Sequence, residues 1–231
     1  PLGAMRFNSD SQKLEYWIGD AWMQIKTFSP TLDGGARGVL AGGYGGANVN
    51  VIDYFTISTA GNATDFGDLL YKANRNAAWS SSIRGYWGGG APAAPNTIND
   101  IIFSSTGDAT DFGDMNNGFL YGAGCSSATR GTIALGDVGG GSAVDQISYV
   151  TLSDSGEGID FGNLTDSRNR LGAFSSPTRG VFTGGYSPGN VNTMDYITIA
   201  STGNAQDFGD LQAARHGCSG LSNSIRGITV S

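Results

Sequence analysis

The sequence predicts an all-β protein, and more narrowly a five-bladed β-propeller with four antiparallel strands in each blade. Two short motifs return with a period near 47 residues, which indicates a repeat architecture. The tripeptide Asp-Phe-Gly begins at Asp65, Asp111, Asp160 and Asp207, at intervals of 46, 49 and 47 residues. The dipeptide Arg-Gly begins at Arg37, Arg84, Arg130, Arg179 and Arg226, at intervals of 47, 46, 49 and 47 residues. Each unit also holds four short apolar segments, and four strands in about 47 residues are typical of a propeller blade.

Residues 179–225 contain the elements of one unit. The predicted strands are RGVFTGGY at 179–186, MDYITIA at 194–200, QDFGDL at 206–211 and GCSGLSN at 217–223. These segments are short, rich in β-branched and aromatic residues, and bounded by Gly, Ser and Asn, which is the pattern of strands separated by turns. The same division gives blade units at approximately 37–83, 84–129, 130–178 and 179–225.

The fifth blade is predicted to form from both ends of the chain. Residues 226–231 belong to its inner strands, and residues 5–36 supply the remainder. In that segment MRFN, KLEYWIG and WMQIKTF match the register of later strands in other units, with Tyr16 or Trp17 near the position of the triplet phenylalanine. Because closure removes strand edges that would template aggregation, residues 1–231 are interpreted as one domain. Residues 1–4 also fit the remnant of a cleaved tag.

The repeated residues are interpreted as structural. The phenylalanines of the triplet, Phe66, Phe112, Phe161 and Phe208, are expected to pack between adjacent blades. The five repeated arginines are expected to form ion pairs with the triplet aspartates, or to bind backbone carbonyls, at the seams between blades. Cys125 occupies a position that holds Leu32, Trp79, Phe174 or Leu221 in other units, so its thiol is expected to be a buried apolar filler.

Composition excludes several classes of protein. Thirteen basic and 20 acidic residues give a formal charge of −7 without a basic cluster, so nucleic acid is not an expected partner. The sequence has no run of 18 apolar residues and no basic-then-apolar signal peptide, so membrane insertion is not expected. The two cysteines lack the spacing of metal ligands, and no glycine loop resembles a phosphate-binding motif. We therefore expect neither a metal nor a cofactor.

An enzymatic role is not expected. Catalytic acids in a repeat protein should break the repeat symmetry, and the acids that do so are Glu15, Asp33, Asp137, Asp154, Glu157 and Asp166. Asp154 and Glu157 fall in a predicted turn at a blade periphery, far from a central funnel that could host paired carboxylates. His216 is the only histidine, so the sequence offers no histidine cluster. A glycan hydrolase is therefore the least favoured alternative.

Two sets of variable loops are predicted to emerge on one face of the disc. They follow the Arg-Gly strand and the Asp-Phe-Gly strand of each unit, whereas the turns on the opposite face are nearly identical between units. Variation on a constant scaffold is where binding usually resides. Aromatic and polar side chains in or beside these loops are the candidate ligand-binding residues: Tyr44, Tyr71, Arg75, Trp87, Asn96, Tyr121, Arg170, Tyr186 and Arg215.

The repeat resembles the kelch motif. The likeness rests on Gly-Gly-Tyr, a loop, a hydrophobic-Asp-Tyr strand, a Thr-Gly-Asn turn, an aromatic residue and Ala-Ala-Arg. In the fourth unit Phe208 takes the place of the motif's tryptophan, and Arg215 takes the place of its trailing arginine. At the arginine position of the other units, Arg75 and Arg168 match loosely and Phe119 replaces the arginine. The five units also make the protein similar to sugar-binding propellers of the tachylectin type, whose residue motifs are absent here.

A second resemblance is more specific. The combination of STGNAxDFGDL and SSxTRGxFxGGY after an opening MRFNSDSQKLEYW resembles repeat proteins of tailed bacteriophages of marine and cyanobacterial hosts. That family implies a virion component of the neck or tail-fibre type. The chain is expected to be either such a protein or a domain cut from a longer fibre protein. The expected function is a non-enzymatic virion module that binds a host-surface glycan or protein, or other virion proteins. A purely structural decoration without a ligand is the alternative.

Overall fold

The computed structural model describes residues 1–8, 13–24, 37–139, 141–223 and 225–231. The chain divides into two compact units, Pro1–Leu32 and Asp33–Ser231. The described residues form strands and turns without a helix, and every pairing between named strands is antiparallel. The prediction of an all-β protein is confirmed.

The N-terminal unit contains one three-stranded sheet, in the order β1-β2-β3. Its strands are β1 (Met5–Asn8), β2 (Lys13–Trp17) and β3 (Trp22–Gln24), so the predicted strands MRFN and KLEYW are present. Arg6 forms an ion pair with Glu15 on the neighbouring strand (2.8 Å) and lies over the ring of Trp22, 4.2 Å from its centroid. Residues 25–36 of the predicted closing blade lie outside the described part of the chain.

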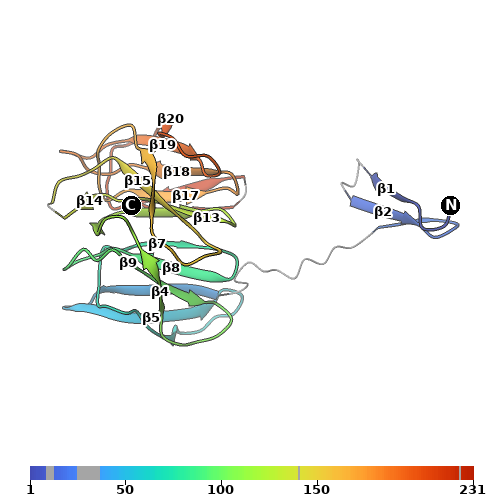
Figure 1. Ribbon diagram of the computed structural model, residues 1–231, viewed down its shortest axis with the longest axis horizontal. Coiled ribbons are helices and arrows are strands. Elements are labelled where there is room, and N and C mark those ends of the chain that lie inside the picture. The colour runs from blue at the N-terminus through green and yellow to red at the C-terminus, as the bar shows by residue number, and fades with distance from the viewer. Residues whose placement is uncertain (9–12, 25–36, 140, 224) are drawn as a thin grey trace. The chain divides into compact units, whose positions relative to one another are not determined.

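The second unit is a series of sheets that follow one another in chain order, from β4 and β5 at the lower edge of Figure 1 to β19 and β20 at the upper edge. The first sheet has three described strands: β4 (Arg37–Tyr44), β5 (Asn48–Thr56) and β6 (Thr64–Asp68). The second sheet has four: β7 (Ala77–Ser80), β8 (Arg84–Gly88), β9 (Thr97–Ile102) and β10 (Thr110–Asp114).

Two further four-stranded sheets have the same order. The third sheet contains β12 (Ala123–Ser126), β13 (Arg130–Ala134), β15 (Gln146–Thr151) and β16 (Ile159–Asn163). The fourth contains β17 (Gly172–Ser175), β18 (Arg179–Thr183), β19 (Thr193–Thr198) and β20 (Gln206–Asp210). Two strands form the last sheet, β21 (Ser219–Ser222) and β22 (Gly227–Val230), and a small ladder joins β11 (Phe119–Leu120) to β14 (Asp137–Val138).

The sheets begin one strand earlier than the predicted units. The segment that ends each predicted unit pairs with the following Arg-Gly strand, as β7 pairs with β8 and β12 with β13. A three-residue turn explains this grouping, because it forms a tight hairpin in which the first serine accepts the backbone N–H of the arginine. The Ser81 Oγ to Arg84 N distance is 3.0 Å, and the Ser127 Oγ to Arg130 N distance is 3.2 Å.

The hydrophobic core lies in the seams between neighbouring sheets. One cluster joins Tyr86 and Phe112 of the second sheet to Val150 of the third sheet and to Leu135, which directly follows β13. Two similar clusters hold Phe66 and Phe161 at the seams on either side. Phe66, Phe112 and Phe161 are buried, which agrees with the predicted packing between blades, whereas Phe208 on β20 is 45% exposed.

The glycine of each Asp-Phe-Gly triplet lies at a bulge, and in the first three triplets this bulge contacts the next sheet. The strand register shifts at Gly113 and its counterparts, and the backbone there has a φ that favours glycine. A Cβ atom on Gly67 would lie 2.3 Å from the carbonyl oxygen of Gly107, and one on Gly162 would lie 2.4 Å from that of Gly203. Close contact with the next sheet therefore requires glycine at Gly67, Gly113 and Gly162, but not at Gly209.

In three of the Arg-Gly pairs, those with Gly131, Gly180 and Gly227, the glycine receives a side chain from the preceding sheet. A Cβ on Gly131 would lie 2.5 Å from the indole of Trp79, and one on Gly180 would lie 2.6 Å from the Sγ of Cys125. Cys125 is 4% exposed, and burial raises the pKa of its thiol to about 12. These contacts support the interpretation of Cys125 as a buried filler.

The repeated arginines bind carbonyls across the seams in two cases. Arg37 Nη1 donates to the carbonyl of Phe103 (2.5 Å), and Arg130 Nη1 donates to the carbonyl of Ile199 (2.9 Å). None of the three ion pairs among the described residues includes a triplet aspartate. Instead, the side chains of Asp111 and Asp207 accept the backbone N–H of the glycine two residues later, at 2.9 and 3.0 Å. The carbonyl alternative therefore fits these arginines better than ion pairing does.

Candidate functional site

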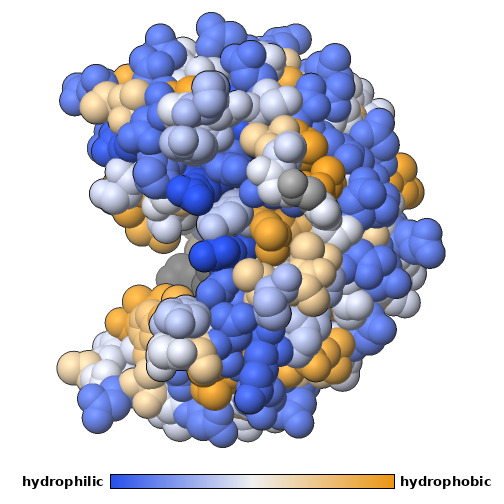
Figure 2. All heavy atoms as spheres, turned by 90° about the vertical axis from the view of Figure 1, so that its left-hand side faces the viewer, coloured by the Kyte–Doolittle hydropathy of each residue, from blue (hydrophilic) through white to orange (hydrophobic). Residues whose placement is uncertain are grey.

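The two sets of variable loops lie at the same end of the strands, as predicted. Hydrogen bonds join them from Gly43 N to the carbonyl of Ala73 (2.8 Å) and from Gly185 N to the carbonyl of Arg215 (2.9 Å). Figure 2 looks onto the side of the molecule that carries β14, and strongly hydrophilic side chains gather near the middle of this face. The middle of the loop face is therefore polar.

Three of the predicted binding residues occupy equivalent positions in successive loops. Arg75, Tyr121 and Arg170 all have left-handed backbones, with φ angles of 61°, 56° and 56°. Tyr121 N donates to the carbonyl of Arg75 (3.0 Å), Arg170 N to that of Tyr121 (3.0 Å), and Gly217 N to that of Arg170 (2.8 Å). This chain of hydrogen bonds brings side chains 46 and 49 residues apart in the sequence into one line.

The side chains of these residues stack on one another. The guanidinium carbons of Arg75 and Arg170 lie 4.8 and 4.7 Å from the ring centroid of Tyr121. Arg170 also lies 5.6 Å from the ring of Tyr186, which packs edge-to-face against His216 at 5.8 Å. We call Arg75, Tyr121, Arg170, Tyr186 and His216 the arginine–tyrosine row. Each cation–π contact contributes about 0.5–2 kcal/mol, depending on its exposure to water.

Several polar atoms close to this row have no hydrogen-bond partner among the described residues. They are buried and comprise the Nε atoms of Arg170 and Arg215 and the Oδ1 atoms of Asn74 and Asn169. Asn169 does use its Nδ2 group, which donates to Asp137 at 2.7 Å. Because an unpaired buried polar group costs free energy, these atoms are a local cost to folding beside the row.

The other predicted binding residues divide into two groups. Trp87 is 6% exposed within the core cluster of Ile52 and Phe66, so its ring is unavailable to a ligand, contrary to the binding role expected from the sequence. The Tyr71 hydroxyl donates to the carbonyl of Thr97 (2.9 Å), and burial raises the pKa of Tyr71 to about 12. Tyr44 and Asn96 are exposed and lie outside the row.

Sequence reasoning missed the part that His216 and Asn190 play. His216 Nδ1 lies 2.7 Å from the Oδ1 of Asn190, so the loop after β18 holds the histidine against Tyr186. No direct indication of this contact came from the sequence, because Asn190 belongs to one variable loop and His216 to another. Arg168, a loose match to the kelch arginine, is fully buried in an ion pair with Asp195 (2.8 Å) and donates to the carbonyl of Gly184 (3.0 Å).

The acids considered for hydrolysis do not converge in the structure. Asp154 and Glu157 are exposed in one turn, Asp137 is buried beside Asn169, and Asp33 lies outside the described residues. Glu15 belongs to the N-terminal unit, where the Asn8 side chain, together with Arg6, lowers the pKa of its carboxyl. The described residues contain no group of three or more side chains suited to a metal.

Comparison with known proteins does not identify a relative. No protein-family model matches the chain, and no curated protein matches its sequence. Within the described ranges, no helix has the length and apolar character that crossing a membrane requires. The functional assignment therefore depends on the geometry of the chain itself.

Proposed function

We propose that the chain is a non-enzymatic binding module of the β-propeller type, in which the successive sheets are blades. Support comes from the four-stranded order of three sheets and from the contact of each first strand with the next, β7 with β12, β12 with β17 and β17 with β21. We further infer that β21 and β22 are the inner strands of a fifth blade, whose remaining strands come from the N-terminal segment, residues 5–36. The resemblance to tailed-phage proteins extends this proposal to a virion component.

The proposed ligand is a host-surface glycan, and the arginine–tyrosine row is the observation that carries the proposal. Stacking on tyrosine holds a guanidinium in place while its planar N–H edges stay free to donate in pairs. Hydroxyl pairs and carboxylates of a saccharide match that geometry. Because Arg75 and Arg170 both lie in the row, it favours glycans that carry acidic groups, in spite of the negative charge of the whole chain.

The row extends over several loops, so a long polysaccharide could contact more than one position. Individually weak contacts add through the high effective concentration of linked sites. A virion displaying many copies of the module would gain further avidity in the same way. Host-surface attachment therefore does not require a deep pocket on this face.

The test is a binding screen against host-envelope polysaccharides, with and without carboxylated members, followed by the shift in unfolding temperature and by calorimetry. Arg75→Ala and Tyr186→Ala should each weaken binding about tenfold, which corresponds to about 1.4 kcal/mol. Tyr44→Ala is the matched control, because Tyr44 is exposed on the same face and lies outside the row. Equal affinity of all three variants would contradict the proposed site.

A purely structural virion decoration is the second candidate. It is favoured by the internal pairing of the row, in which arginines and tyrosines already satisfy one another across loops. In that case no polysaccharide would shift the unfolding temperature. The variants of the row would lower the stability of the protein and would have no binding to lose. Release of reducing ends from a polysaccharide would favour the hydrolase alternative over both.

A further inference from the structure

The second sheet departs from the repeat at one cross-strand pair. In the other sheets a tyrosine on the third strand faces a smaller residue on the Arg-Gly strand: Val39–Tyr54, Thr132–Tyr149 and Val181–Tyr196. In the second sheet the equivalent pair is Tyr86 on β8 and Asp100 on β9. The aromatic residue has changed strands, and a carboxylate occupies its usual place.

The exchange preserves the packing of the triplet phenylalanine. Tyr86 meets Phe112 edge-to-face with ring centroids 5.0 Å apart. The usual tyrosines meet their phenylalanines in the same way, at 5.8 Å for Tyr54–Phe66 and 6.0 Å for Tyr149–Phe161. The core therefore gives no reason for an acid at position 100, since an apolar residue would fit beside the same aromatic pair.

The exchange does change what the repeated arginine does. Arg37, Arg130 and Arg179 stack on the usual tyrosine at 4.8, 4.2 and 4.3 Å, whereas Arg84 forms an ion pair with Asp100. Two of those arginines also reach a carbonyl of the next sheet, but at this seam the Tyr86 hydroxyl bonds the carbonyl of Leu152 instead (3.3 Å). Arg84 is thereby held against its own sheet.

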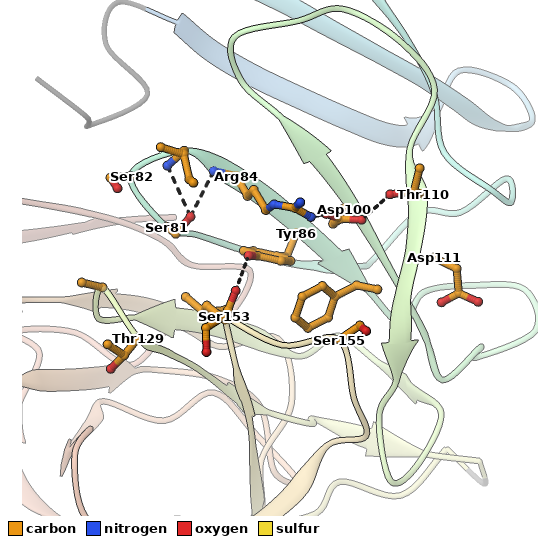
Figure 3. A pocket seen from close by; sticks show the side chains of 14 residues that line it. Ser81, Ser82, Arg84, Tyr86, Asp100, Thr110, Asp111, Thr129, Ser153 and Ser155 are labelled. Carbon is orange, nitrogen blue, oxygen red and sulfur yellow. Dashed lines mark hydrogen bonds and ion pairs between the residues drawn. The ribbon is translucent and has the colours of Figure 1, made fainter.

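A cavity of about 570 Å³ lies at this seam, a volume within the usual range of small-molecule sites. Arg84, Asp100 and Thr110 line one wall, and Thr129, Ser153 and Ser155 from the third sheet face them (Figure 3). Asp100 is 2% exposed and accepts a hydrogen bond from the Thr110 hydroxyl (2.6 Å). Donors and acceptors thus alternate around a space that breaks the symmetry of the repeat.

We propose that this cavity binds a neutral polyhydroxyl ligand of monosaccharide size. The charges of Arg84 and Asp100 cancel, and Asp111 at the rim adds a negative charge that disfavours anions. The guanidinium of Arg84 can donate to a sugar oxygen, and the exposed carboxylate of Asp111 can accept from a hydroxyl. The serine and threonine hydroxyls can do either, while the buried Asp100 holds Arg84 in place. The cavity lies at the turn end of the strands, opposite the variable loops, so this proposal is independent of the arginine–tyrosine row.

The experiment measures binding of glucose, galactose, mannose and N-acetylglucosamine to the full chain by saturation-transfer NMR and calorimetry. Glucuronic acid and methylammonium serve as anionic and cationic probes. Ser155→Trp fills the cavity from an exposed turn and should weaken sugar binding at least tenfold. Thr202→Trp, the same turn position in the fourth sheet, is the matched control and should bind sugar with unchanged affinity.

A double variant tests the role of the exchanged pair directly. Tyr86→Val with Asp100→Tyr restores the arrangement of the other sheets, so it should fold and yet lose sugar binding. Tyr186→Ala in the row should leave this binding unchanged, which separates failure here from failure of the proposed glycan function. The proposal is overturned if no neutral sugar binds, if Ser155→Trp binds sugar as well as the control does, or if methylammonium is the preferred probe.

Discussion

At the scale of single residues, the repeated glycines explain why the motifs recur. A motif that returned for catalysis would need its aspartate in a common site, whereas Asp65, Asp111, Asp160 and Asp207 are all exposed and separate. The glycine of the triplet instead lies where another sheet touches the backbone. Gly209 is the informative exception, because a Cβ there would meet nothing within 4 Å.

This contrast predicts unequal effects of the same substitution. Gly162→Ala and Gly209→Ala both introduce a side chain at a positive φ, which costs about 1–3 kcal/mol. Only Gly162→Ala also forces a contact with the carbonyl of Gly203, so it should destabilise by about 1–3 kcal/mol more than Gly209→Ala. Urea unfolding of the two variants measures the difference, and equal losses would contradict a seam contact at Gly162.

The buried thiol of Cys125 predicts a loss of stability at alkaline pH. Burial raises its pKa from the usual 9.0 to about 12, so below pH 9 both the folded and the unfolded chain keep the proton. Between these values the unfolded chain releases it and the folded chain does not. The free energy of unfolding should therefore fall by up to about 1.4 kcal/mol for each pH unit from this group.

Cys125→Ala should make the decline of the free energy of unfolding with pH shallower. Tyr71, whose pKa is also raised to about 12, should maintain part of that decline above pH 10. Chemical unfolding at several pH values between 8 and 11 gives the two slopes. Identical slopes for the wild type and Cys125→Ala would show that the thiol titrates normally.

At the scale of elements, a ladder of serines joins the first strands of successive sheets. Ser126 Oγ donates to the carbonyl of Ser80 (2.5 Å), Ser175 Oγ to that of Ser126 (2.7 Å), and Ser222 Oγ to that of Ser175 (2.6 Å). The backbone N–H of Ser126 also bonds back to Ser175 Oγ (3.3 Å). These strands lack a regular ladder between sheets, so side chains supply the connection.

Ser175→Ala should therefore destabilise the protein more than its position near the surface suggests. It removes a donor and an acceptor at once, and we expect a loss of about 1–3 kcal/mol. Ser80→Ala is the matched control, because Ser80 contributes its carbonyl to the ladder, and it should change stability by less than about 0.5 kcal/mol. Thermal unfolding compares the two, and similar losses would argue against the ladder.

At the scale of the whole molecule, the last sheet has two strands and a broad apolar surface. Leu221, Ile225, Ile228 and Val230 are 69%, 93%, 57% and 52% exposed. An unpaired strand with apolar neighbours invites pairing with another strand. This surface is what the proposed fifth blade would cover with strands from residues 5–24.

Leu14→Pro in the full chain tests that closure. Proline removes a backbone donor from β2 and breaks its pairing, which disrupts the strand that would join the fifth blade. If the blade is shared, the amides of β22 that do not bond to β21 should be protected from hydrogen exchange in the wild type and exposed in the variant. Unchanged exchange in β22 would contradict closure by the N-terminal strands.

The period of the repeat, its strand segments and the buried position of several repeated residues could be predicted from the sequence alone. Composition and motif spacing report local properties, and strands and turns depend mainly on such properties. Phe112 could be assigned to a seam because a phenylalanine recurs at the same position of four units. Cys125 could be assigned as a filler because its equivalents are apolar.

Which residues share a surface depends on three-dimensional packing, which the local sequence pattern leaves open. The grouping of strands into sheets depends on the hairpins at Ser81 and Ser127, and the buried position of Trp87 depends on the seam beside it. The arginine–tyrosine row and the cavity at Asp100 join residues from different sheets, whose meeting depends on register across the seams. That register is set by packing between distant segments, so local sequence patterns do not specify it.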